Sequence, residues 1–370
     1  MEDLGTALSD GDLRRAYAGR RVLITGITGF KGAWLASWLV RLGADVRGLA
    51  LDPPTVPSLW DMLRLGDAVP WDRVDLRDAN TVAAVVENAR PEVIFHMGAQ
   101  ALVPEARRDP LGTLQTNTLG TANVLEATRH AGRPLALVCV TTDKCYAPSP
   151  TGQPHHELDR LGGHEVYAAS KAAAELVVTA WRQSWFPVHR LASHGVLITT
   201  ARSGNAVGPG DHAPDRLVPD ALRAFRAGTP LVLRRPHAVR PWQHVLAPLW
   251  GYLMLGAHTL VGAPNRARWS GPWNFGPPPD DEVPVAQVIT TLAEAWGPTA
   301  QWTAPPSTLP ETGVLRLDSH QAQRRLGWRC PWPLDHVLRR VVGGEQMLDR
   351  GDAVAMVTAE LDAFTKAIAP

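Results

Sequence analysis

A glycine-rich turn between two apolar runs limits the folds open to this chain more than any other feature. The run Val22–Ile24 fits a buried strand, and the run Ala33–Val40 fits a helix that begins directly after the turn. Glycine lets the backbone approach a ligand, and the helix N-terminus supplies free N–H groups with partial positive charge, so the geometry suits a diphosphate. The spacing Gly-x-x-Gly-x-x-Gly predicts a dinucleotide site formed by Gly26, Gly29, Phe30 and Gly32.

A carboxylate follows the second predicted strand. Asp52 stands twenty residues after Gly32 and directly after the apolar run 44–51. A carboxylate there can accept from both ribose hydroxyls and would repel a 2′-phosphate, which predicts NAD rather than NADP. Glycines chosen only for helix–sheet packing are the alternative, and the strand and carboxylate in register favour the dinucleotide site.

Strand-like and helix-like segments alternate from residue 20 to about 205. The predicted strands are Arg21–Thr25, Asp45–Leu51, Val93–Met97, Ala136–Thr141 and Leu197–Ala201, and the predicted helices are Ala33–Leu42, Ala79–Ala89, Leu111–Ala131 and Val166–Gln183. Helices between strands at this spacing predict an α/β fold with a doubly wound parallel sheet.

The character of the chain changes beyond Gly208, where Pro and Gly become dense and the helices shorten. This composition predicts a smaller C-terminal α/β domain that binds substrate. We expect an NAD-binding domain over residues 18–207 and 240–260, a substrate-binding domain over 208–239 and 261–345, and a helical tail over 346–370.

Composition excludes several classes of function. Lys and Arg number 37 against 36 Asp and Glu, without a charge block, so binding to nucleic acid or a membrane surface has no electrostatic support. The polar N-terminus is unlike a signal peptide, and no run of about 18 apolar residues occurs. Cys139, Cys145 and Cys330 show neither metal-ligand spacing nor an even disulfide framework. We expect a cytoplasmic protein without a metal.

A tyrosine and a lysine stand four residues apart at the start of a predicted helix. Tyr167 and Lys171 therefore share one face, and Thr142 lies at a strand end on the ligand-binding rim of the sheet. Lowering a tyrosine pKa from about 10 to about 7 takes about 4 kcal/mol, which Lys171 and a nicotinamide cation could supply in a water-poor pocket. Such a pair is common by itself, and gains meaning from the glycine turn and Thr142.

The chain resembles the extended short-chain dehydrogenase/reductase family, and within it the CDP-glucose 4,6-dehydratase subfamily. The resemblance covers about residues 18 to 345. It rests on the runs GITGFKGAWLASWL (26–39), ALDPPTVPSL (50–59), TTDKCY (141–146), LGGHEVYAASKAAAELVV (161–178), ARSGNAVGPGD (201–211), RLVPD (216–220), RPWQHVL (240–246) and WNFGP (273–277).

The resemblance implies a dehydratase that keeps NAD tightly bound and recycles it in each turnover. In that reaction Tyr167 takes the proton of the carbon 4 hydroxyl, Thr142 binds its oxygen, and Asp143 protonates the leaving hydroxyl of carbon 6. Lys144 stands where relatives place a carboxylate base, so it would act as the base, steady an enolate or hold Asp143. A capping hydroxyl at Thr142 and a surface ion pair of Asp143 with Lys144 are the structural alternatives.

The resemblance also carries binding roles onto matching positions. Asp75 and Leu76 would hold the adenine, and Ala99 and Gln100 would line the cofactor. The nucleotide diphosphate and sugar would contact Asn205, Arg216, Arg240 and Asn274. Turn-forming roles for Asp75 and the asparagines, and solvated surface positions for the arginines, are the alternatives.

Three stretches near the expected sugar pocket depart from the subfamily pattern. They are residues 101–107, residues 147–156, and Gly98 where alanine is usual. A changed substrate and neutral drift of the loops explain them equally well.

Two other functions compete with the dehydratase. One is a different family enzyme on a nucleotide-linked compound, such as an epimerase, a decarboxylase or another dehydratase. The other is a dinucleotide-sensing regulator without turnover, which the Tyr167–Lys171 pair disfavours. The resemblance further implies a homodimer through a four-helix contact of Leu111–Ala131 and Val166–Gln183.

Overall fold

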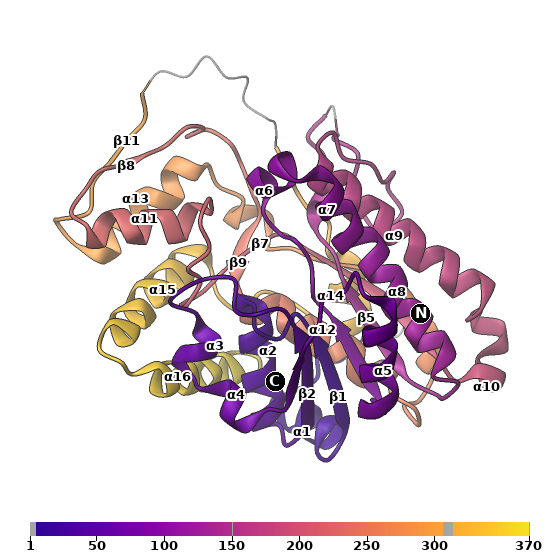
Figure 1. Ribbon diagram of the computed structural model, residues 1–370. Coiled ribbons are helices and arrows are strands. Elements are labelled where there is room, and N and C mark those ends of the chain that lie inside the picture. The colour runs from indigo at the N-terminus through magenta and orange to yellow at the C-terminus, as the bar shows by residue number, and fades with distance from the viewer. Residues whose placement is uncertain (1–4, 150, 306–313, 370) are drawn as a thin grey trace.

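The computed structural model describes residues 5–149, 151–305 and 314–369. Its centre is a seven-stranded sheet in the order β10-β6-β5-β4-β1-β2-β3, in which all neighbouring strands are parallel (Figure 1). Its strands are β1 (Arg21–Thr25), β2 (Asp45–Ala50), β3 (Trp71–Arg73), β4 (Val93–His96), β5 (Ala136–Val140), β6 (Leu197–Ser203) and β10 (Gly271–Phe275). The predicted α/β doubly wound parallel sheet is confirmed.

Helices cover both faces of this sheet because successive residues of a strand point to opposite sides. In β1, Val22 and Ile24 enter one core, and Leu23 enters the other. The first core is formed with α1 (Asp10–Tyr17), α2 (Phe30–Arg41), α12 (Leu246–Thr259) and α16 (Ala353–Ala367), and the second with α5 (Ala79–Ala89), α8 (Gly120–His130) and α9 (Val166–Ser184).

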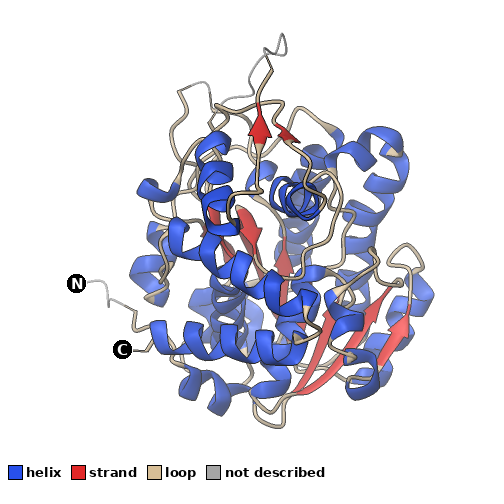
Figure 2. Ribbon diagram, turned by 90° about the vertical axis from the view of Figure 1, so that its left-hand side faces the viewer, coloured by secondary structure: helices blue, strands red, loops and turns tan. Residues whose placement is uncertain are grey.

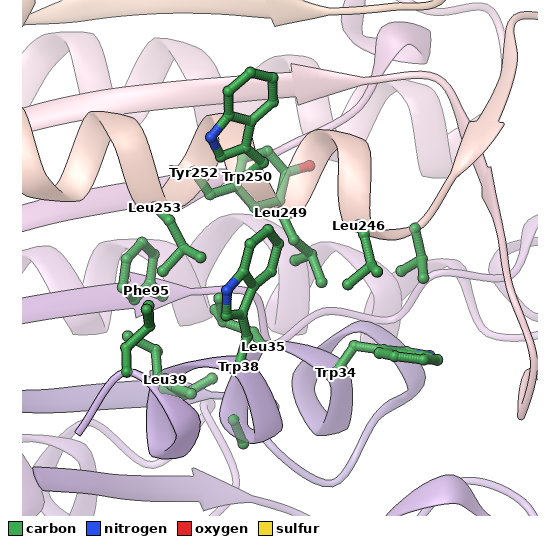
Figure 3. Close-up of a cluster of buried hydrophobic side chains, with 14 of the residues drawn as sticks. Trp34, Leu35, Trp38, Leu39, Phe95, Leu246, Leu249, Trp250, Tyr252 and Leu253 are labelled. Atoms are coloured by element: carbon green, nitrogen blue, oxygen red, sulfur yellow. The ribbon is translucent and has the colours of Figure 1, made fainter. Parts of the chain in front are cut away.

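Helix α12 is apolar on all sides and buried along nearly its whole length. It contacts β4, β5 and β6 and packs on α2. Figure 3 shows Trp34 and Trp38 of α2 in one apolar cluster with Leu249 and Leu253 of α12 and Phe95 of β4. The segment therefore returns to the large sheet, as its all-round apolar character predicts.

A second group of elements lies to one side of the sheet and has its own apolar core (Figure 1). It contains α11 (Leu217–Arg226), α13 (Val285–Trp296), α15 (Leu334–Asp349), and two small sheets, β7 (Asn205–Val207) with β9 (Trp242–His244) and β8 (Leu231–Val232) with β11 (Trp302–Thr303). Figure 2 shows the many helices that surround the strands.

The large sheet extends past the predicted domain boundary. Strand β10 lies within 261–345, which the sequence assigns to the smaller domain, yet it pairs with β6. The tail also joins the first core, where Phe364 of α16 lies 5.6 Å from Trp38 between ring centroids. The two-domain division stays a prediction.

One predicted helix is wrong in detail. The segment Leu111–Ala131 forms α7 (Pro110–Leu114), a π-helical turn (Gln115–Leu119) and then α8. The turn presents Asn117 to the sheet edge, where its Oδ1 accepts from the Gln100 N–H and its Nδ2 donates to Ser170. Wide turns of this kind commonly serve such side-chain contacts. Short helices complete the chain: α3 (Leu59–Met62), α4 (Leu65–Ala68), α6 (Val103–Arg108), α10 (Leu191–His194) and α14 (His320–Leu326).

Candidate active site

The glycine turn forms a close backbone approach between β1 and α2. Gly26 has a φ of +71°, and a Cβ there would lie 2.7 Å from the Gly98 Cα. A Cβ on Gly32 would lie 2.2 Å from the Gly26 carbonyl oxygen. Gly29 caps α2 without a side chain, so no side chain satisfies the first N–H groups of the helix. These residues fit a dinucleotide diphosphate.

The two carboxylates predicted to bind the cofactor are paired with arginines that the sequence analysis did not consider. Asp52, after β2, lies 2.7 Å from Arg73, and Asp75 lies 2.6 Å from Arg77. Hydrogen bonds from these arginines lower the pKa of both carboxyl groups, so both are ionised at neutral pH. Asp52 remains exposed and able to accept from a ribose.

Gly98 packs closely against Leu76 and Thr25. A Cβ on Gly98 would lie 2.7 Å from Cδ1 of Leu76 and 3.1 Å from Oγ1 of Thr25. Leu76 thus packs under the cofactor turn, and Ala99 follows β4 at the same edge. Gln100 also lies there, but its side chain donates to Thr113 and accepts from the Leu102 N–H, so both of its ends are bound.

The end of β5 brings the predicted acid into a buried position. Thr142 Oγ1 donates to Asp143 Oδ1 at 2.9 Å and accepts from the Lys144 N–H at 3.3 Å. Asp143 is 2% exposed, and its Oδ2 has no hydrogen-bond partner among the described residues. Burial raises the pKa of the Asp143 carboxyl, which favours the protonated form that a general acid needs.

Helix α9 brings Tyr167 and Lys171 to the same strand end, where Lys144 follows Asp143 in the chain. The Glu165 side chain caps the helix by accepting from the N–H groups of Tyr167 and Ala168. The Lys144 Nζ lies 5.7 Å from the Tyr167 ring centroid, and the Lys171 Nζ donates to the Val140 carbonyl oxygen at 3.3 Å. The structure therefore brings all five predicted catalytic residues together.

Burial and two neighbouring residues act in opposite directions on the pKa of Tyr167. Burial raises its pKa to about 12, against a side-chain hydrogen bond with Thr142 and the charge of Arg216, which lower it. Burial also lowers the pKa of Lys171 to about 8. Reaching a tyrosine pKa of about 7 then takes about 7 kcal/mol rather than about 4, because desolvation opposes the cations.

A buried ion pair that the sequence analysis missed supports this group. Glu175, one turn after Lys171, is 1% exposed and binds Arg202 of β6 at 2.8 Å. It also accepts from Thr141, next to Thr142, and from Thr200. The spacing Lys-x-x-x-Glu places Glu175 on the same helix face as Lys171 and could have been noticed in the sequence. The hydrogen-bond partners of Glu175, however, come from the ends of two strands far away in the chain.

The predicted substrate arginines lie near the same edge. Arg216 caps α11 and lies 2.9 Å from Asp211. Burial lowers the pKa of Arg240, and the charge of Asp143 raises it, which places Arg240 near the acid. Asn205 begins β7, and its N–H donates to the Pro241 carbonyl oxygen.

The structure does not support the predicted substrate contact of Asn274. This residue is 0% exposed, and its Oδ1 accepts from the Tyr146 hydroxyl at 2.7 Å. Its Nδ2 donates to the carbonyl oxygens of His155 and Asp318. Asn274 therefore holds the divergent loop, in which His155 also stacks on Tyr146 at 4.7 Å.

The described residues contain no cluster of His, Cys, Asp or Glu that could hold a metal ion. Over the same part of the chain, no helix is long and apolar enough to cross a membrane. Its three cysteines are free thiols.

Comparison with known proteins decides the family. The family model described as "NAD dependent epimerase/dehydratase family" matches residues 22–258. The chain belongs to this family. Membership confirms the resemblance to extended short-chain dehydrogenases/reductases and NAD as the cofactor.

Relatives extend this assignment. The chain is 39% identical to a CDP-glucose 4,6-dehydratase of Salmonella typhimurium over 91% of its own length and 93% of that protein. It superposes on a UDP-glucose 4-epimerase of Thermus thermophilus in complex with NAD, with a TM-score of 0.72 and 27% identity over 88% of this chain and 99% of that one. The dTDP-glucose 4,6-dehydratase DesIV of Streptomyces venezuelae has the same fold, with a TM-score of 0.71 and 23% identity over 87% and 96% of the two chains.

Proposed function

We propose that the protein is a nucleotide-sugar 4,6-dehydratase that acts on CDP-glucose. The reaction oxidises carbon 4, removes water across carbons 5 and 6, and yields the 4-keto-6-deoxy sugar. The observation that carries the proposal is the buried Asp143 beside Lys144, Tyr167 and Lys171 at one strand end. The extensive identity to a CDP-glucose 4,6-dehydratase supports the choice of substrate.

The first step uses Tyr167 and Thr142. Tyr167, as tyrosinate, takes the proton of the carbon 4 hydroxyl, while Thr142 holds that oxygen and Lys171 supplies positive charge. Gly26, Gly29 and Gly32 of the glycine turn would hold NAD tightly through turnover, and the bound cofactor would supply a hydride acceptor at carbon 4 that is recycled at carbon 6. The reaction is therefore redox-neutral overall.

The second step uses Asp143 and Lys144. The ketone at carbon 4 acidifies the hydrogen on carbon 5, which a base removes. Asp143, whose protonated form burial favours, would protonate the hydroxyl that leaves carbon 6 as water. Lys144 serves as the base when it is neutral, and as an ammonium it would instead steady the enolate or hold Asp143.

Binding of the substrate diphosphate is assigned to the arginines of the second group of elements. Arg216 and Arg240 lie close enough to the catalytic group for their charges to act on Tyr167 and Asp143, respectively. Guanidinium groups suit bidentate phosphate contacts. Asn205, which precedes both arginines in the chain and begins β7 of a small sheet, completes the proposed substrate contacts, whereas Asn274 is withdrawn from them.

Mass spectrometry of products tests the proposal. The purified protein is incubated with NAD and CDP-, dTDP-, GDP- or UDP-glucose, with Tyr167→Phe as the inactive control. We expect CDP-glucose to lose one water without net formation of NADH. Inversion at a carbon without loss of water, detected by NMR because the mass is unchanged, would replace the dehydratase by an epimerase. Loss of carbon dioxide from a nucleotide-linked uronic acid added to the panel would indicate a decarboxylase.

A variant pair separates the dehydratase from an epimerase at the site itself. Epimerisation needs no acid–base pair at positions 143 and 144, so Asp143→Asn with Lys144→Met should abolish loss of water but spare an epimerase. Removal of a general acid typically lowers the rate by about 10²–10⁴-fold.

The proposal includes a homodimer. Helices α7, α8 and α9 lie side by side (Figure 1), and exposed apolar side chains lie on α7, in the π-helical turn after it, and on and directly after α9. These are Leu111, Leu114, Leu119, Leu176 and Trp185. Pairing this surface with a second copy would form a four-helix contact. Sedimentation of the wild type and of Leu119→Glu/Leu176→Glu should give a dimer and a monomer, and a monomeric wild type would contradict the proposal.

The free thiols suit the cytoplasm, where we place the enzyme.

A further inference from the structure

Lysine is rare in this chain, and its positions are informative. Only four of the 37 basic residues are lysines: Lys31, Lys144, Lys171 and Lys366. Two belong to the catalytic group, and Lys366 is exposed on α16. Arginine supplies the other positive charges, including the buried partner of Glu175. Lys31 is half-buried in the first turn of α2. This position therefore carries the compact ammonium of a lysine in a chain whose basic residues are almost all arginines.

The Lys31 side chain reaches the strand edge that carries the catalytic group. Its Nζ donates to the Ser203 Oγ at 3.1 Å, and Ser203 is the last residue of β6, the neighbour of β5. Tyr252 of α12 donates to the same Oγ at 2.9 Å, and the Nζ lies 5.9 Å from the Tyr252 ring centroid. This contact holds the ammonium at the end of β6 rather than in solvent.

The charges around Lys31 are those of the reaction centre. Burial lowers its pKa to about 8, and beyond that it is affected by the cations Arg216 and Lys171 and by the carboxyls of Asp143 and Asp211. Asp211 is already paired with Arg216, and burial favours the neutral form of Asp143. Positive charge is thus in excess at this edge of the sheet, and an anionic group of a ligand would balance that charge.

Lys31 also has hydrogen-bonding capacity to spare. An ammonium has three donors, and within the described part of the chain one of them is taken, by Ser203. We propose that Lys31 is a further catalytic residue, whose ammonium contacts the hexose and stabilises the negative charge that develops on it during loss of water. This inference rests on the proposed dehydratase function.

The proposed role can be written without a change in the protonation of Lys31. When the base takes the carbon 5 proton, the electrons of the C–H bond form a carbon 4–carbon 5 double bond, and the carbonyl electrons move to oxygen as an enolate. When those electrons return, the carbon 6–oxygen bond breaks, and the hydroxyl leaves as water with the proton of Asp143. Lys31 keeps its proton and contributes charge throughout.

The alternative is that Lys31 binds the dinucleotide diphosphate, because it stands within the glycine turn. Its contacts favour the substrate side. Ser203 belongs to β6 rather than to the turn, and the charges that act on Lys31 are Asp143, Lys171 and the proposed substrate residue Arg216. The two roles differ in which ligand is lost when the ammonium is removed.

The test compares Lys31→Met with the matched control Lys366→Met, which removes the exposed lysine. Three quantities are measured for each: affinity for NAD, the rate of water loss from CDP-glucose, and reduced nicotinamide absorbance during a single turnover. We expect Lys31→Met to lose water about 10²–10³-fold more slowly, the usual effect of removing one stabiliser of transition-state charge. NAD affinity should be unchanged, and reduced nicotinamide should accumulate because oxidation at carbon 4 proceeds while elimination stalls. Lys366→Met should behave as the wild type.

Two further variants keep the test decisive. Lys31→Ala should regain part of its rate with added ethylammonium, a rescue that a packing role would not give. Should Lys31→Met fail to fold, Lys31→Gln allows the same comparison, because its amide can still reach towards Ser203.

Three outcomes would overturn the inference. Normal elimination by Lys31→Met is one, and weak NAD binding with normal elimination once NAD is saturating is the second. The third is a wild-type protein that removes no water from any nucleotide hexose, which would refute the proposed function itself. In the first two outcomes the wild type is active, so the proposed function stands and only the role of Lys31 fails.

Discussion

The buried Glu175–Arg202 pair gives a prediction whose size follows from the structure. Glu175→Gln removes the negative charge but keeps the shape of the side chain. Both partners are nearly inaccessible, at 1% and 3% exposure, and Arg202 binds the carboxylate through Nε at 2.9 Å and Nη2 at 2.8 Å. Burial would raise the pKa of Glu175, yet Arg202 and two threonines hold it below its usual value. The pair is therefore charged at neutral pH.

Loss of one partner leaves an uncompensated buried charge. We expect Glu175→Gln to lower the free energy of unfolding by about 3–5 kcal/mol, a large part of the typical 5–15 kcal/mol. Urea denaturation followed by circular dichroism measures the change. The matched control is Glu126→Gln, since Glu126 is also on a helix but pairs with Arg129 at the surface, and it should cost less than about 1 kcal/mol.

A double variant separates the charge from the position of the catalytic strand. Glu175→Met with Arg202→Met removes both charges, and apolar replacement of a buried pair is often close to neutral for stability. We expect it to recover most of the stability but not the turnover, because Thr141 beside Thr142 loses its acceptor on α9. A cost below about 1 kcal/mol for Glu175→Gln would refute this reasoning.

Three other predictions test separate parts of the account. Asn274→Ala should lower the free energy of unfolding by about 3 kcal/mol, because three hydrogen bonds of its side chain are lost, and should leave the KM for CDP-glucose unchanged. A raised KM at full stability would restore the predicted role of Asn274 in substrate binding. Asp52→Asn should weaken NAD binding and reduce the preference for NAD over NADP in fluorescence titrations, whereas unchanged binding of both would remove Asp52 from the cofactor site. Burial lowers the pKa of His96 and His244 from 6.5 to about 3. The unfolded chain therefore binds more protons between these pH values, and the free energy of unfolding falls as the pH drops from 6.5 towards 3, by up to about 1.4 kcal/mol per pH unit for each histidine. Urea titrations of His96→Gln should show a shallower decline than the wild type, and an equal slope would contradict this.

Local patterns in the sequence predicted the sheet, its helices and the catalytic group. The glycine turn, the Tyr167–Lys171 spacing and the end of β5 are each set by neighbouring residues, so the sequence reveals them directly. The exception is the segment Leu111–Ala131, whose helical periodicity does not reveal the π-helical turn that Asn117 requires.

Contacts between distant segments could not be predicted in this way. Strand β10 joins β6 across about seventy residues, and Arg202 meets Glu175 from another strand. The same holds for Asn274, for which the resemblance implied a substrate contact but which is enclosed by Tyr146 and His155. The sequence shows that Lys31 lies in the glycine turn, but the direction of its side chain is fixed by a hydrogen bond to Ser203, far along the chain.

Transfer of label within the substrate tests the central claim most directly. CDP-glucose carrying deuterium on carbon 4 is incubated with the enzyme and NAD, and the product is analysed by mass spectrometry and NMR. The account predicts a 4-keto-6-deoxy sugar with the deuterium on carbon 6 and no net NADH, because the hydride removed from carbon 4 is returned there. Deuterium that remains on carbon 4 of a product that has lost no water would contradict the account and identify an epimerase.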